Sequence, residues 1–135
     1  VENYRSPERF ERELRLLRRT PVPLCPSAAL PETGSYLARS AAGTSIVAVR
    51  GEDGRVRAFR NACRHRGTPV ASGSGCAKAL VCPYHAWTYR LDGGLDYVPH
   101  EHGFPGLDKD AHGPVPVVAA GRPGPGIVAA DPPPG

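Results

Sequence analysis

The sequence contains no methionine among its 135 residues, and it begins with Val1. Because an open reading frame normally shows an initiator, we expect a fragment, a processed chain or a trimmed version of a longer protein. No apolar run approaches the roughly 20 residues that a membrane helix needs, and the first residues do not resemble a signal peptide. These absences predict a cytoplasmic protein with no membrane partner.

The chain also lacks the usual signature of a nucleic-acid-binding protein. Lys and Arg number 17 against 13 Asp and Glu, which gives a net charge of +4. Much of this excess lies between Arg9 and Arg19, and no basic stripe alternates with stacking aromatic residues. We therefore expect no nucleic-acid partner. The arginines fit either a solvated helix face or a docking surface for an acidic electron-transfer partner, because complementary charge speeds encounter.

A chain of 135 residues is long enough for one domain with a sizeable hydrophobic core, but too short for two such domains. Gly and Pro contribute 16 residues each, so loops should be abundant. Half of the prolines follow residue 104, and order should fade toward Gly135. We predict an N-terminal helix in residues 1–20, one domain in residues 21–130 and a Pro-rich disordered end in residues 131–135.

Local patterns predict a single helix near the start of the chain. Residues 6–8 (Ser-Pro-Glu) are typical of a helix N-terminus. Phe10, Leu14 and Leu17 then recur on one helix face. The helix should end by Thr20, because the proline that follows disfavours helical geometry in the residue before it.

The rest of the chain reads as short strands and turns. We expect a connecting loop over residues 21–31. The predicted strands, each bounded by turn residues, cover residues 35–40, 45–50, 55–61, 79–81, 86–91, 95–98, 115–119 and 127–129. Asp53-Gly54 is a strong hairpin signal between two of them. The sequence therefore predicts a mainly β, antiparallel domain.

Two cysteine–histidine motifs stand out in the middle of the chain. Cys63 and His65 form a C-x-H motif, and Cys82 and His85 form a C-x-x-H motif. Residues two apart in an extended segment point the same way, so one loop can aim both of its donors at one site. A Rieske centre binds one iron through two cysteines and the other through two histidines. The motifs therefore predict a Rieske [2Fe–2S] cluster with these four ligands.

The mixed ligand set also predicts the redox character of the centre. Neutral imidazoles make the cluster less negative than one held by four thiolates, so an electron is added more easily. Rieske centres span roughly −150 to +300 mV, against about −400 mV for plant-type ferredoxins. Because the histidines exchange protons, the potential should fall at high pH.

Two other interpretations of the motifs remain open at this point. Cysteine and histidine in a β domain are sometimes unrelated core and surface residues. Cys₂His₂ is also a legitimate structural zinc set, although zinc sites usually use C-x₂₋₄-C and H-x₃₋₅-H spacing. An absorption or EPR spectrum distinguishes zinc from iron–sulfur, since zinc is colourless and EPR-silent.

Around these motifs the sequence resembles the alpha subunits of Rieske non-haem iron ring-hydroxylating oxygenases. Residues 61–67 are similar to their first cluster loop and residues 82–89 to their second. Residues 4–13 are similar to the helix that precedes the domain, and residues 93–99 to the strand that follows the second loop. The resemblance implies a Rieske-type antiparallel β domain with a small cluster-binding subdomain and one N-terminal α-helix.

The resemblance also implies roles for the neighbours of the ligands. Residues expected to shield the cluster or to shape its loops are Arg66, Gly67, Pro83, Tyr84 and Trp87. Ordinary core packing is an equally good interpretation of Trp87 and Tyr89. Respiratory Rieske proteins carry one further cysteine in each loop, whereas this chain has Thr68 and Tyr84 there, which favours the oxygenase type. Cys25 and Cys76 are expected to be bystander thiols, with a disulfide between them left open.

The function implied by the resemblance is electron transfer as the N-terminal part of an oxygenase alpha subunit. A ferredoxin or flavin reductase would donate the electron, and a catalytic domain with a mononuclear Fe(II) site, absent from this chain, would accept it. The remaining histidines, His100, His102 and His112, read as surface loop residues rather than as that site. The alternative function is a free-standing Rieske ferredoxin that carries electrons without a catalytic domain.

Overall fold

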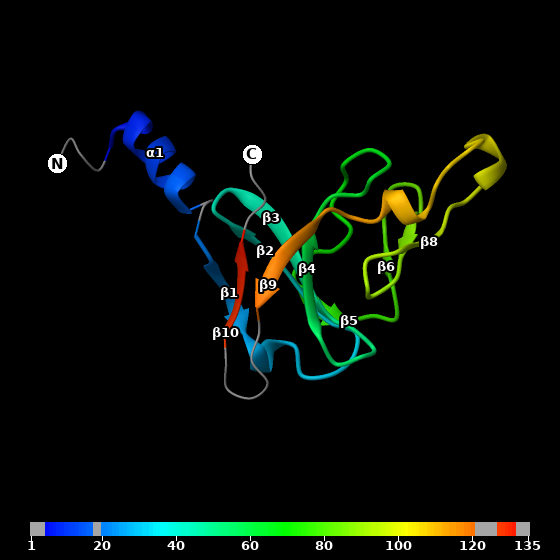
Figure 1. The fold of residues 1–135 in the computed structure, drawn as a ribbon, viewed down its shortest axis with the longest axis horizontal. Helices are drawn as coiled ribbons and strands as arrows, with labels where there is room; N and C mark the ends of the chain where they lie inside the picture. Colours follow the sequence, from blue (N-terminus) through cyan, green and yellow to red (C-terminus); the bar gives the residue numbers. More distant parts are fainter. Residues whose placement is uncertain (1–4, 18–19, 121–126, 132–135) are drawn as a thin grey trace.

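The computed structural model describes residues 5–17, 20–120 and 127–131 (Figure 1). Helix α1 (Pro7–Leu17) begins where the sequence predicts, and the Arg9 amide donates a 3.4 Å hydrogen bond to the Ser6 hydroxyl. No residue of α1 is buried, and its Phe10 side chain is 59% exposed. Figure 1 shows the helix extending away from one end of the β structure. The Pro-rich end lies outside the described residues, apart from Asp131.

A seven-stranded antiparallel sheet forms the body of the molecule. Its strand order is β1-β10-β9-β4-β3-β2-β5. The strands are β1 (Val22–Pro26), β2 (Ser35–Ala41), β3 (Thr44–Arg50), β4 (Val56–Arg60), β5 (Ser74–Cys76), β9 (Pro116–Ala120) and β10 (Ile127–Asp131). The hairpin predicted at Asp53-Gly54 joins β3 to β4, and Gly54 takes a φ of 74° in the turn.

Two strands of this sheet were not predicted. The loop prediction for residues 21–31 is wrong, because β1 and the 3₁₀ helix η2 (Ser27–Ala29) occupy most of that segment. β1 pairs with β10, about a hundred residues later in the chain, so its partner gives no local signal. β5 is a short edge strand that pairs with β2 through Ser35, Tyr36 and Leu37.

A smaller unit is inserted between β4 and β9. It contains a three-stranded antiparallel sheet of β6 (Leu80–Val81), β7 (Thr88–Tyr89) and β8 (Leu95–Tyr97). The short 3₁₀ helices η3 (Glu101–Gly103) and η4 (Asp110–His112) follow. In Figure 1 this unit lies on the opposite side of the large sheet from α1. The predicted mainly β, antiparallel fold with one N-terminal helix is confirmed.

Strand β3, which lies between β4 and β2, separates two hydrophobic cores. Val47 and Val49 pack into one buried cluster, and Ile46 and Ala48 pack into the other. This alternation follows from the opposite directions of successive side chains in a strand. The first cluster also contains Cys63 and Cys82, so the two motif cysteines are part of the hydrophobic contact that joins the small unit to the large sheet. Among the described residues, no helix has the length and apolar character of a membrane span.

Candidate metal centre

The two motif loops have the same backbone hydrogen-bond pattern. In the first, the Cys63 N–H donates to the Thr68 carbonyl and the Gly67 N–H donates to the Cys63 carbonyl, both at 2.8 Å. In the second, Cys82 makes the equivalent pair of bonds with Trp87 and Ala86, both at 2.9 Å. Each cysteine is thus held at the start of a closed turn. The turn aims the histidine that follows toward the same side as the cysteine.

Both turns close on a residue in the left-handed region. Gly67 has a φ of 77°, as the sharp turn expected there requires. Ala86 occupies the equivalent position with a φ of 57°, although alanine rarely adopts this conformation. The sequence spacing alone, C-x-H against C-x-x-H, does not reveal this shared turn.

The two loops meet, and they bring all four motif side chains together. The rings of His65 and His85 lie 4.8 Å apart between centroids, with an interplanar angle of 65°. Cys63 and Cys82 are 3% and 2% exposed, and the two thiols are close enough to influence each other's ionisation. The thiols therefore form the buried side of the site, and the imidazoles form its outer side.

Tyr89 links the first loop to the small sheet. Its hydroxyl lies 3.1 Å from the Cys63 Sγ and accepts a 2.9 Å hydrogen bond from the Arg64 backbone N–H. Burial, followed by the hydrogen bond to Cys63, raises the pKa of Tyr89, so the phenol keeps its proton. With the Arg64 amide on its oxygen, the hydroxyl has its proton free to donate to the Cys63 sulfur. The sequence was equally consistent with core packing and with a role of Tyr89 at the site. In the structure Tyr89 is buried and its hydroxyl contacts Cys63.

Burial also raises the pKa of the Cys63 thiol. The hydrogen bonds from Tyr89 and from the His65 backbone act in the opposite direction, and the nearby Cys82 thiol raises the pKa again. A metal ligand must be a thiolate, so iron binding here has to release a proton from a group that burial keeps protonated.

His65 is surrounded by aromatic side chains. Its ring stacks on Trp87 at 5.0 Å with an interplanar angle of 8°, and Phe104 lies 5.7 Å away in a perpendicular orientation. Burial, then the electrostatic influence of His85 and Arg66, lowers the pKa of His65. The imidazole is therefore kept neutral, which is the form that binds metal. Phe104 was not predicted at this site, because nothing in the local sequence links it to the motifs.

Asn61 fastens the first loop to the large sheet. Its Oδ1 accepts hydrogen bonds from the amides of Val70 and Ala71 at 2.9 and 3.1 Å. Its Nδ2 donates to the Ala71 carbonyl at 2.8 Å and to the Ser45 hydroxyl at 3.2 Å. A single buried amide thus joins both ends of the first loop to the start of β3. Asn61 falls within the segment that resembles the family loop, but its role depends on contacts that the sequence does not contain.

The five residues expected to shield the cluster occupy different places. Trp87 is buried against His65, whereas Pro83, Tyr84, Arg66 and Gly67 are exposed. The Tyr84 ring lies 3.9 Å from the His85 ring, and the Arg66 guanidinium carbon lies 5.6 Å from the centroid of Tyr84. Trp87 is therefore placed to cover the inner histidine. Tyr84 and Arg66 lie at the rim around the outer one.

The four motif side chains are two thiols and two imidazoles, the donor set that a Rieske centre uses. Within the described residues, no three His, Cys, Asp or Glu side chains converge as a mononuclear site would need. A Rieske centre requires only two protein donors at each iron. The pairing of buried thiols on one side and imidazoles on the other matches that division.

The other cysteines and histidines lie away from the two loops. Cys25 is buried in the second core and Cys76 is exposed on β5, and both are free thiols. His100, His102 and His112 lie in the exposed segment that carries η3 and η4, where Glu101 pairs with Lys109 at 2.8 Å.

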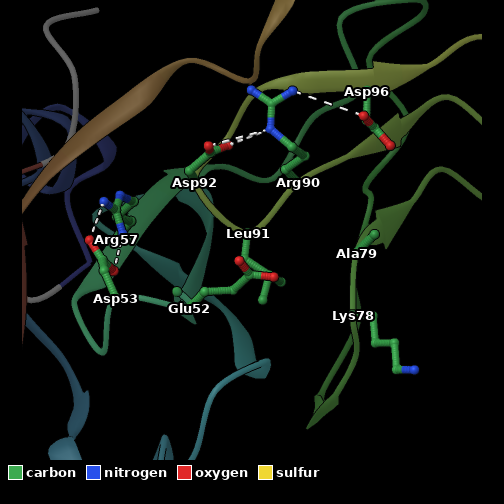
Figure 2. A pocket seen from close by; sticks show the side chains of 10 residues that line it. Glu52, Asp53, Arg57, Lys78, Ala79, Arg90, Leu91, Asp92 and Asp96 are labelled. Atoms are coloured by element: carbon green, nitrogen blue, oxygen red, sulfur yellow. Dashed lines mark hydrogen bonds and ion pairs between the residues drawn. The ribbon is translucent and has the colours of Figure 1, made fainter.

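A separate hollow of about 340 Å³ lies between the β3–β4 turn and the small unit. Figure 2 shows the side chains that line it. Arg57 bonds Asp53 through two 2.8 Å contacts there, and Arg90 pairs with Asp92 at 3.3 Å. Because opposite charges neutralise each other along its wall, this hollow presents no single sign of charge to a ligand.

Comparisons with known proteins agree with this geometry. The family described as Rieske [2Fe-2S] domain matches residues 20–116. The chain is 38% identical over 116 residues to the carnitine monooxygenase oxygenase subunit of Acinetobacter baumannii, covering 84% of this chain and 31% of that protein. It is 35% identical over 109 residues to the biphenyl 2,3-dioxygenase alpha subunit of Rhodococcus jostii, covering 78% and 24%.

Solved structures give the same picture. A quaternary ammonium Rieske monooxygenase in complex with an inhibitor superposes with a TM-score of 0.87 at 33% identity, covering 96% of this chain and 36% of that one. The chain thus spans about a third of the length of the relatives it matches. It belongs to the Rieske [2Fe–2S] domain family and corresponds to the N-terminal part of Rieske oxygenase alpha subunits.

Proposed function

We propose that this chain transfers single electrons through a Rieske [2Fe–2S] cluster held by Cys63, His65, Cys82 and His85. The observation that carries the proposal is the convergence of the two motif loops, with buried thiols on one side and imidazole rings 4.8 Å apart on the other. When bound, such a cluster accepts and releases one electron at a time.

The residues around the site have different roles in the proposed electron transfer. Cys63 and Cys82 would hold one iron through sulfurs that lie in the hydrophobic core, and the core would keep water from them. His85 lies at the surface beside the exposed Tyr84 ring, so a partner that docks on this face would exchange electrons through His85. The Tyr89 hydroxyl donates to the Cys63 sulfur and so stabilises negative charge there.

The exposed face around His85 favours an acidic partner. The Arg66 guanidinium carbon lies 5.6 Å from the centroid of the Tyr84 ring, which in turn contacts the His85 ring. Arg64 and Arg66 flank His65 and are both exposed. A ferredoxin or flavin reductase with an acidic face fits as the electron donor, because opposite charges steer encounter.

We further propose that the parent protein is an NAD(P)H- and O₂-dependent oxygenase. Its mononuclear Fe(II) domain would lie in the length that the relatives have beyond this chain, and it would accept the electron. The relatives include subunits named for carnitine and for biphenyl. The substrate of the parent is therefore either a quaternary ammonium compound or an aromatic ring, and ring hydroxylation is the reaction in the second case. A cytoplasmic location belongs to the same proposal, since the exposed free thiol of Cys76 suits a reducing compartment.

Cysteine substitutions test the ligand assignment. Cys63→Ser and Cys82→Ser should each abolish the EPR signal of the dithionite-reduced protein and lower its iron content to background. Cys76→Ser is the matched control: it removes an exposed thiol outside the loops and should leave both measurements unchanged. A cluster signal retained at full intensity in Cys63→Ser would contradict the assignment.

The coding DNA beyond Gly135 tests the parent. A continuing frame that encodes D-x₂-H-x₃₋₄-H supports an oxygenase alpha subunit, because two histidines and a carboxylate form the facial triad of non-haem iron. A stop codon at that point, with an initiator shortly upstream of Val1, supports the free-standing ferredoxin instead.

A further inference from the structure

We infer that Phe104 is a positioning residue for His65, and that the segment of residues 99–113, here called the cover segment, shields the His65 side of the centre through this one side chain. The inference rests on the proposed function for the cluster itself. The aromatic contacts that it uses do not depend on that function.

The rings of His65, Trp87 and Phe104 each contact the other two. His65 contacts both Trp87 and Phe104, and the latter two contact each other at 5.6 Å with an interplanar angle of 83°. Trp87 is parallel to the imidazole and Phe104 is perpendicular to it. Rotation of the imidazole about its side-chain bonds would break both contacts, so the pair fixes the plane of the ring.

The two histidines are therefore held differently. The ring of His65 has aromatic neighbours from two separate parts of the chain: Trp87, directly before β7, and Phe104 in the cover segment. The ring of His85 contacts His65 and the exposed Tyr84. Among the residues that the structure describes, a hydrophobic ring from outside the two motif loops contacts His65 and not His85.

The cover segment is held by few contacts of its own. None of its residues, all of which are described, belongs to a strand. Lys109 Nζ binds the Glu101 carboxylate at 2.8 Å and the Asp96 carbonyl at 3.2 Å, both at exposed positions. Phe104 and Leu107 are the residues through which the segment packs against the core that contains the cysteines.

This arrangement gives Phe104 two effects on a bound cluster. It orients an imidazole ligand, as residues behind a ligand commonly do. It also keeps water from one side of the centre, and water stabilises the more negative, reduced state. Loss of the ring should therefore loosen the ligand and raise the reduction potential.

Four variants of the cluster-loaded chain test this inference. Phe104→Leu keeps an apolar side chain but removes the ring, and Phe104→Ala removes the cover as well. Cluster loss to a chelator should be faster in Phe104→Leu and faster still in Phe104→Ala, by about tenfold or more, the range typical of residues behind a ligand. Both variants should shift the EPR g-values, and Phe104→Ala should raise the midpoint potential.

Two further variants separate positioning from packing. Phe104→Tyr restores the ring and should return the g-values and the chelation rate to those of the original chain. Leu107→Ala removes the other apolar anchor of the same segment and should lower the melting temperature without shifting the g-values. Unchanged g-values and chelation rate in both Phe104→Leu and Phe104→Ala overturn the inference, as does an equal shift in Leu107→Ala.

The outcomes distinguish this inference from the proposed function. If the original chain binds no iron–sulfur cluster, the proposed function fails. Proton NMR of the metal-free chain then tests the contact directly, because the His65 ring protons should shift in Phe104→Leu and not in Leu107→Ala. If the original chain binds the cluster and the Phe104 variants match it, only the inference about Phe104 fails.

Discussion

At the residue scale, the Tyr89 hydroxyl is placed to tune a cluster held by the four motif residues. It lies in the core, accepts a hydrogen bond from a backbone amide and faces the Cys63 sulfur at 3.1 Å. A donor at this position stabilises a sulfur ligand more strongly as the cluster becomes more negative. Hydrogen bonds to the sulfurs are one of the determinants of reduction potential in iron–sulfur proteins.

Tyr89→Phe should therefore lower the reduction potential while the cluster remains bound. Loss of one such hydrogen bond predicts a decrease of about 50 mV, since 59 mV corresponds to a tenfold change for one electron. Spectroelectrochemical titration measures the potential. Tyr97→Phe, at an exposed position on β8, is the control and should leave the potential unchanged. An equal or higher potential in Tyr89→Phe would count against a donor role for the hydroxyl.

At the element scale, the shared turn of the two motif loops has a measurable energetic asymmetry. The first loop closes on Gly67 and the second on Ala86, both in the left-handed region. This conformation costs a residue with a side chain energy that glycine does not pay. A Cβ atom added to Gly67 would meet no atom within 4 Å, so the backbone angle alone decides the effect there.

Gly67→Ala should destabilise the protein by about 1 kcal/mol, and Ala86→Gly should stabilise it by up to about 1 kcal/mol, after the greater chain entropy of glycine is subtracted. Thermal unfolding of both variants measures these changes. Gly103→Ala is the control, because Gly103 has neither a positive φ nor an atom within 4 Å of an added Cβ. A lower melting temperature in Ala86→Gly would contradict the prediction that the left-handed backbone conformation of Ala86 destabilises the folded chain.

The elements also differ in how far the sequence predicts them. The β2–β3 and β3–β4 hairpins follow from local turn residues and neighbouring apolar runs, and they lie close to the predicted positions. β1 does not, because Pro23 and Pro26 read as a loop and its partner β10 is distant in the chain. A register shift between Pro23 and Cys25 allows the strand to pair in spite of these prolines.

At the scale of the whole molecule, charged pairs within the β3–β4 turn and within the small unit line the hollow between them (Figure 2). A hydrogen bond from Arg57, followed by one from the Arg55 amide, holds the pKa of Asp53 well below its usual range. The Gly94 amide and Arg90 lower the pKa of Asp92. Unfolding returns both carboxyl groups to a pKa of about 3.9.

A carboxyl group whose pKa is lower in the folded state than in the unfolded state makes the free energy of unfolding decrease as the pH falls. These carboxylates contribute stability above their unfolded pKa, and the contribution is lost as the pH falls through the folded value. The melting temperature should therefore decrease from about pH 5 downward, near and below the unfolded pKa of about 3.9. Asp53→Asn should weaken this decrease, and high salt should do the same because both groups are exposed. Glu52→Gln, beside it in the turn, is the control; an acid slope unchanged by Asp53→Asn would refute its role.

The sequence by itself determined which metal-binding side chains this protein offers. The types and spacing of Cys63, His65, Cys82 and His85 limit the donors to two sulfurs and two nitrogens, and hairpin residues limit the fold to antiparallel strands. The tertiary structure alone decided what surrounds those donors. Phe104 reaches the site from a separate segment, and Tyr89 and Asn61, although they lie in the motif segments, contact Cys63 and Ser45 across the fold. Such contacts depend on how the small unit packs on the sheet. A local pattern carries no information about neighbours that only folding brings together.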